Sequence, residues 1–86
     1  MYRILFKPSF IRQAKRLNKD QFQLLKRKVE LLKNRNNHQA LKVHKLHGRL
    51  AKFHSFSLDY SLRIIFKFES ENLISFTEIG SHDIYK

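Results

Sequence analysis

The sequence of 86 residues contains no cysteine, one proline and two glycines. The absence of cysteine excludes a disulfide framework and a thiolate metal site, and it fits a reducing compartment. No apolar run approaches the roughly 20 residues that a membrane-spanning helix needs, and the run at residues 1–6 is too short for a signal peptide. We therefore expect a cytoplasmic protein of one domain, residues 1–86, with no membrane segment.

Acidic side chains are scarce in the first part of the chain. Residues 1–52 hold fifteen lysines and arginines but only Asp20 and Glu30, whereas residues 53–86 hold three basic and five acidic residues. The formal net charge of the whole chain is +11. Such a concentration of positive charge is typical of proteins that bind a polyanion, and nucleic acid is the favoured partner. An acidic protein would be attracted equally well, so charge alone leaves both partners open.

The first half of the chain has the apolar spacing of helices. Residues 2–6 read as a short strand that stops before Pro8, and proline suits the first turn of a helix. Asn18 and Gln21 have the spacing of a capping box at the start of a second helix. Apolar residues at helical spacing form two stripes, Phe10, Ile11, Ala14 and Leu17 in the first helix and Phe22, Leu25, Val29 and Leu32 in the second. These patterns predict a helical hairpin that residues 34–37 end.

The second half has the two-residue period of strands. Residues 38–50 are polar and basic and are predicted to be mostly loop. Alternating residues then predict strands at 53–58, 62–68 and 73–79, with a hairpin turn at 69–72. The expected fold class is α+β, an N-terminal strand and a three-stranded antiparallel meander in one sheet with the helices on one face. Alternation places Arg63, Ile65 and Lys67 on the face away from the helices.

Three segments of the chain resemble a known family. The segments are Leu-His-Gly-Arg-Leu-Ala at 46–51, Tyr-Ser-Leu-Arg-Ile-Ile-Phe at 60–66, and Ile-Gly-Ser-His-Asp-Ile-Tyr at 79–85. Together with the order of elements, they are similar to the RelE/ParE toxin superfamily, and most similar to its RelE/YafQ-like messenger RNA interferases. The resemblance covers nearly the whole chain. It implies a RelE-like fold and the toxin of a type II toxin–antitoxin pair.

The resemblance also implies an activity and partners. Such toxins cut messenger RNA on the 70S ribosome without a cofactor, and a cognate acidic antitoxin neutralises them. The implied assembly is a monomer when free and a hetero-oligomer with the antitoxin. Metal-free RNA cleavage needs a base for the 2′-hydroxyl proton, a cation for the phosphorane charge and an acid for the leaving 5′-oxygen. DNA lacks the 2′-hydroxyl nucleophile and is therefore not a substrate.

Arg63 and His82 are the leading catalytic candidates. Arg63 lies within a strand, where its planar fork suits a scissile phosphate, and it matches the family's arginine at this strand position. The alternative is a surface salt bridge with Glu78. His82 matches the family's histidine after the last strand and is the candidate general acid. The alternative is a histidine that only hydrogen-bonds to Asp83.

The remaining candidates are less sharply defined. Tyr85 either contacts RNA by stacking or through the phosphate, or anchors the C-terminus in the core. His44 matches a histidine of the YafQ-like branch and leads Lys52 and His54 as general base. No histidine aligns with the one that this branch has near Ser57, because His54 lies three residues earlier and on the opposite face of the predicted strand. The predicted RNA-binding residues are Lys45, His47, Arg49, Lys52, His54 and Lys67.

Three other functions remain open from the sequence. His44 and His47, together with His82 and Asp83, contain enough nitrogen and oxygen donors for zinc, but nothing in their spacing forces them together. A ParE-like toxin would share the fold and bind DNA gyrase without a nuclease site. A basic module would bind RNA without cutting it. Replacement of His82 by alanine separates these alternatives, because only a nuclease needs a titratable group there.

Overall fold

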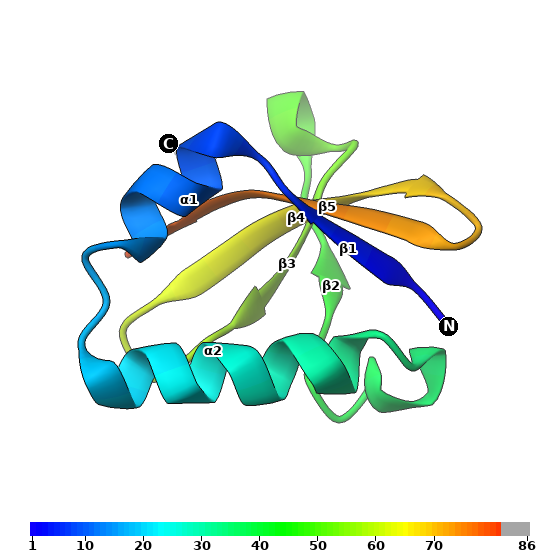
Figure 1. Ribbon diagram of the computed structural model, residues 1–86. Helices are drawn as coiled ribbons and strands as arrows, with labels where there is room; N and C mark the ends of the chain where they lie inside the picture. Colours follow the sequence, from blue (N-terminus) through cyan, green and yellow to red (C-terminus); the bar gives the residue numbers. More distant parts are fainter. Residues whose placement is uncertain (82–86) are drawn as a thin grey trace.

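The computed structural model describes residues 1–81 (Figure 1). Along the chain it contains β1 (Arg3–Phe6), α1 (Pro8–Ala14), α2 (Lys19–Leu32), β2 (His44–Lys45), β3 (His54–Ser57), β4 (Arg63–Ser70) and β5 (Leu73–Gly80). Two short 3₁₀ turns, η1 (Arg35–Asn37) and η2 (Gly48–Leu50), flank β2. The order confirms the predicted α+β class. Among residues 1–81, no helix has the length and apolarity needed to cross a bilayer.

The strands form one mixed sheet in the order β1-β5-β4-β3-β2. β3, β4 and β5 make the predicted antiparallel meander, and β1 runs parallel to β5 at one edge. β2 pairs antiparallel with β3 at the other edge, through His44 opposite Ser55 and Lys45 opposite His54. This strand lies in a segment predicted to be mostly loop. A strand of two residues is too short to show a two-residue period, so it could not be predicted from the pattern of apolar residues.

The two faces of the sheet differ as the alternation predicts. α2 lies across one face (Figure 1), where Ile64 and Phe66 are fully buried in the core cluster. Arg63 and Lys67 belong to the other face. Ile65 lies on that face too, yet it is only 3% exposed. On β4, the face away from α2 therefore carries a buried Ile65 between the basic residues Arg63 and Lys67.

α2 begins at the predicted capping box. The Asn18 side chain accepts a hydrogen bond from the Gln21 backbone N–H at 2.7 Å, and the Gln21 side chain accepts one from the Asn18 N–H at 3.0 Å. Of the predicted stripe, Leu25, Val29 and Leu32 are buried, but Phe22 remains 46% exposed. Phe22 lines a surface groove between α2 and β1 instead of entering the core. The helical period alone cannot tell these two environments apart.

Candidate functional site

A polar hollow of about 660 Å³ opens where the β3–β4 hairpin meets α2 and the segment before β2. It brings together Arg63 from the start of β4, Lys28 from α2 and Lys42 from the loop. The remaining lining residues are Ala40, Leu41, Ser57, Asp59 and Tyr60. Three cations from three separate elements therefore surround one opening, and this is an arrangement suited to a phosphate group.

Arg63 is fixed by its position in the sheet. It lies opposite Ser57 on β3 and opposite Gly80 on β5. One guanidinium nitrogen, Nη1, donates to the backbone oxygen of Asp59 at 3.4 Å. Glu78, the sequence-based salt-bridge alternative, is opposite Ile65 in the strand register, two residues along β4 from Arg63. The strand thus holds the guanidinium of Arg63 at the rim of the hollow.

Lys28 completes the edge of β3. Its Nζ donates to the backbone oxygen of Ser57 at 2.9 Å. The short strand β2 does not reach this oxygen, because β2 pairs with β3 only at His54 and Ser55. Burial lowers the pKa of Lys28 from its ordinary value, and the negative charge of Asp59 opposes part of that shift. The ammonium is therefore partly desolvated, and an anion in the hollow would interact with it more strongly than with an exposed lysine.

Lys42 reaches the hollow through an uncommon backbone conformation. Its φ of 58° lies in the left-handed region, which residues other than glycine adopt rarely. The carbonyl of Lys42 is also 3.1 Å from Nδ1 of His44, the next residue but one. The turn at Lys42 thus sets the direction of β2 and places Lys42 and His44 at the same corner of the molecule.

Tyr60, which was not predicted as a site residue, is 98% exposed at the tip of the hairpin between β3 and β4. Asp59 fixes this tip, because its Oδ1 accepts hydrogen bonds from the backbone N–H groups of Ser61 and Leu62, each at 2.9 Å. Burial alone would raise the pKa of Asp59, but these two hydrogen bonds, together with those from the side chains of Ser61 and Gln21, outweigh burial and lower the pKa. The Asp-x-Ser turn at residues 59–61 is the signal that could have identified an aromatic ring beside the hollow.

His44 lies on the same face of the sheet as Arg63. It is opposite Ser55, two residues before Ser57 on β3, and Ser57 is opposite Arg63. Strand spacing and rise place the two Cα atoms roughly 12 Å apart on the diagonal. Side chains of this length, extended from the two positions, can approach one bound group from opposite sides.

His54 lies on the opposite face. Its ring is edge-on to Phe68, with ring centroids 4.7 Å apart, and contacts Phe66 at 5.8 Å. Nδ1 is buried and has no hydrogen-bond partner within residues 1–81. Burial lowers the pKa of His54, and the positive charges of Lys45, His44 and His38 lower it further. The ring of His54 therefore packs as an aromatic residue against Phe66 and Phe68, and a role of His54 in RNA binding stays a prediction.

The other predicted residues lie at several places around the sheet or outside the described residues. His47, Arg49 and Lys52 are exposed on or beside η2, which projects from the side of the sheet opposite α2 (Figure 1). Lys45 is exposed and paired with His54, and the Nζ of Lys67 is 3.7 Å from the Glu69 carboxylate. His82 and Tyr85, predicted to act as acid and as RNA contact, lie outside the described residues.

No metal centre is formed within residues 1–81, because no three His, Asp or Glu side chains converge there. His44 and His47 stand on β2 and at the start of η2, and the other two residues of the zinc alternative are outside the description. That alternative therefore stays a prediction.

Comparison with known proteins identifies the fold. No family model and no curated protein matches the sequence. Among solved structures, YafQ from Escherichia coli strain BL21(DE3) is 18% identical, with 98% of this chain and 97% of that chain covered and a TM-score of 0.79. The E. coli DinJ–YafQ toxin–antitoxin complex is 21% identical, with 96% and 94% covered and a TM-score of 0.73. The YoeB–YefM complex from Staphylococcus aureus is 16% identical, with 95% and 98% covered and a TM-score of 0.74. The chain thus has the fold of the RelE/YafQ-like toxins, as the resemblance implied.

Proposed function

We propose that this chain is the toxin of a type II toxin–antitoxin pair and that it cuts messenger RNA on the ribosome. The observation that carries the proposal is the hollow in which Arg63, Lys28 and Lys42 converge beside the exposed ring of Tyr60. Two further observations support it: the RelE/YafQ-like fold and the net charge of +11.

Each part of the hollow has a place in the proposed reaction. Arg63 holds the scissile phosphate and stabilises the extra negative charge of the phosphorane. Lys28 and Lys42 hold the phosphate or its neighbour, and Tyr60 stacks on an adjacent base. These contacts need no base-pair readout, so they suit single-stranded messenger RNA.

Proton transfer would complete the reaction. His44 takes the 2′-hydroxyl proton as general base, the 2′-oxygen attacks phosphorus, and His82 protonates the 5′-oxygen that leaves. The products are a 2′,3′-cyclic phosphate and a 5′-hydroxyl end. Both roles suit histidine, because a side chain of this type can accept a proton as a base and donate one as an acid.

The proposal is tested by controlled expression of the wild type and of the His82→Ala and Arg63→Ala variants in bacteria, with cleavage sites mapped by primer extension. We expect cuts in translated messenger RNA that both substitutions abolish. Growth arrest without cuts, equally strong in both variants, would exclude the nuclease and direct attention to gyrase. Binding of RNA with neither cuts nor arrest would identify a module that binds without cutting.

A further inference from the structure

One side chain of α2 contacts the tip of the β3–β4 hairpin, next to the polar hollow. The Nε2 of Gln21 donates to Oδ2 of Asp59 at 3.4 Å, and this contact joins residues that are 38 positions apart in the sequence. Both side chains are half-buried. A hydrogen bond of this length is weak, so it adds little to stability, but it holds the Asp59 carboxylate on the side of the tip that faces α2.

The two carboxylate oxygens of Asp59 have different partners. Oδ1 accepts hydrogen bonds from the backbone N–H groups of Ser61 and Leu62, each at 2.9 Å, and from the Ser61 hydroxyl at 3.2 Å. These bonds hold the turn that carries Tyr60. Oδ2 accepts from Gln21. The carboxylate therefore connects the turn to the helix, and a displacement of the carboxylate would displace the turn.

Asp59 also interacts with the groups that line the hollow. Its backbone oxygen accepts from Nη1 of Arg63 at 3.4 Å, and its negative charge acts on Lys28. Tyr60 follows Asp59 in the chain and is 98% exposed, so the packing of its own ring does not fix its position. All three groups therefore depend on where Asp59 is held.

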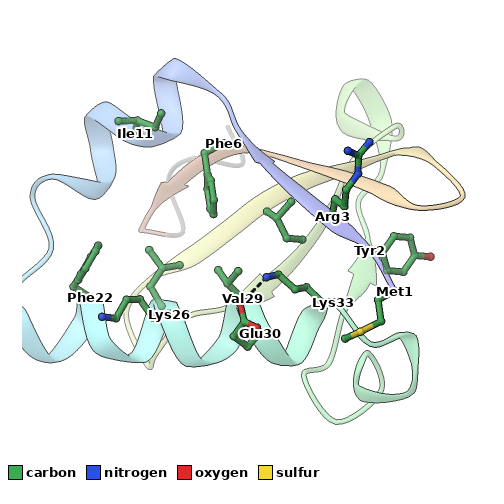
Figure 2. Close-up of a pocket in the computed structure, with 12 residues that line it drawn as sticks. Met1, Tyr2, Arg3, Phe6, Ile11, Phe22, Lys26, Val29, Glu30 and Lys33 are labelled. Atoms are coloured by element: carbon green, nitrogen blue, oxygen red, sulfur yellow. Dashed lines mark hydrogen bonds and ion pairs between the residues drawn. The ribbon is translucent and has the colours of Figure 1, made fainter.

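Gln21 leaves α2 on the side that faces the hollow. It precedes Lys28 by seven residues, which is about two helical turns, so the two side chains point in nearly the same direction from the helix axis. Phe22 and Lys26 point elsewhere and line an apolar groove of about 950 Å³ between α2 and β1, together with Phe6 and Ile11 (Figure 2). A substitution at Gln21 therefore acts on the hollow and leaves the apolar groove unchanged.

Gln21 has a second contact, within the capping box of α2. Its Oε1 accepts a hydrogen bond from the Asn18 N–H at 3.0 Å, while its Nε2 donates to Asp59. Capping needs only the oxygen, and glutamate serves this position of a capping box as well as glutamine does. The capping box therefore does not account for the amide nitrogen, whereas the contact with Asp59 does.

We propose that Gln21 is a positioning residue, which holds Asp59 and the hairpin tip so that Tyr60 and Arg63 bind the same segment of single-stranded RNA. Gln21 does not itself touch the RNA, because it acts through Asp59. The inference deepens the proposed function and rests on it, since the position of the tip affects RNA only if the hollow binds RNA.

The Gln21→Glu variant separates the two contacts of this residue. The new carboxylate still accepts the Asn18 N–H and suits a helix N-terminus, so the midpoint of denaturant unfolding should not change. It cannot donate to Asp59 and repels it, so the tip is released. We expect the amides of Ser61 and Leu62 to exchange about fivefold faster, as the loss of one ordinary hydrogen bond does. Affinity for a single-stranded RNA oligonucleotide, measured by fluorescence anisotropy, should fall about fivefold.

Two further variants exclude a simple effect of charge. Gln23→Glu adds the same charge at an exposed position of α2 that lines neither surface, and it should change the RNA affinity less than about twofold. Gln21→Glu combined with Asp59→Asn exchanges donor and acceptor and restores the wild-type net charge. Asparagine can accept hydrogen bonds in the same turn, and its amide can donate to the new carboxylate. The double variant should therefore regain most of the affinity that Gln21→Glu loses.

Unchanged exchange of the Ser61 and Leu62 amides in Gln21→Glu would overturn the inference. So would faster exchange with wild-type RNA affinity, or a double variant that binds RNA as weakly as Gln21→Glu. Exchange and RNA affinity need no cleavage, so the two proposals can fail separately. If both change as expected but no messenger RNA is cut, only the nuclease is wrong. If the wild type cuts messenger RNA and Gln21→Glu binds and cuts it equally well, only the positioning role is wrong.

Discussion

The polar hollow and the apolar groove lie on opposite sides of the same helix and carry opposite chemistry. Lys28 reaches the hollow and Lys26, two residues earlier on α2, reaches the groove. Two positions along a helix differ by roughly 200° around its axis, so neighbouring lysines serve different surfaces. The hollow adds an arginine and a hairpin tip, whereas the groove adds Phe6, Ile11 and a strand edge. The positive net charge attracts polyanions to both surfaces, and the side chains that line each surface determine which kind of molecule binds there.

The largest expected effect is on RNA cleavage, and it would show that the hollow is the catalytic one of the two surfaces. Arg63→Ala removes the cation proposed to stabilise the phosphorane, and we expect RNA cleavage to slow by about 100-fold or more, as the loss of a positioned donor does. Single-turnover cleavage measured with isolated ribosomal complexes would show it. Arg27→Ala is the control, because Arg27 is an exposed arginine of α2 that lines neither site. Equal losses in both variants would mean that net charge, not the hollow, drives the reaction.

Salt should separate the two surfaces. Three cations that contact phosphates in single-stranded RNA give a logarithmic slope near −2, so raising the salt about fourfold should weaken RNA binding about twentyfold. Lys28→Ala removes one of these contacts and should make the slope less steep by about 0.7, whereas Lys26→Ala, in the groove, should leave the slope unchanged. Fluorescence anisotropy of a labelled RNA at several salt concentrations gives the slopes of the wild type and of both variants. Equal slopes for the two variants would mean that RNA does not distinguish the hollow from the groove.

The shared helix gives the next prediction, a change that should affect both surfaces together. Asn18→Ala removes the capping acceptor of the Gln21 N–H, and we expect the free energy of unfolding to fall by about 1 kcal/mol. Denaturant unfolding measures it. Asn36→Ala, at an exposed position in η1, is the control and should change stability less than half as much. An unchanged stability of Asn18→Ala would show that other contacts hold the start of α2.

Local patterns explain why much of the fold could be predicted from sequence. The capping box at Asn18 and Gln21 and the alternation around Arg63 each depend on residues a few positions apart. The parallel pairing of β1 with β5 could not be predicted, because Arg3 and its partner Leu73 are distant in the sequence and nothing local links them. β2 has only two residues, and its pairing depends on β3.

The candidate site also contains residues that could be predicted from the sequence and residues that could not. Arg63 was predicted because alternation indicated its face and the resemblance implied the role that is proposed for it. Lys28 was not predicted as a lining residue of the hollow. It is one of three consecutive basic residues on α2, and no sequence pattern indicates that Lys28 is the one that contacts Ser57. Tyr60 depends on the turn that Asp59 holds. The groove was hidden for the opposite reason, because Phe22 fits the core period and only tertiary packing shows that it is exposed.

The smallest expected effect concerns His54, a histidine on the α2-covered face that differs from His44 on the open face. Burial lowers the pKa of folded His54, so between its ordinary value of 6.5 and the lower folded value only the unfolded chain takes up this proton. Stability should therefore fall as the pH falls through 6.5 and level off below the folded pKa. His54→Phe fits between Phe66 and Phe68 and removes the buried Nδ1, and unfolding at several pH values should show a flatter profile for this variant. A profile with the same slope in the wild type and in His54→Phe would mean that the pKa of His54 does not differ between the folded and the unfolded chain.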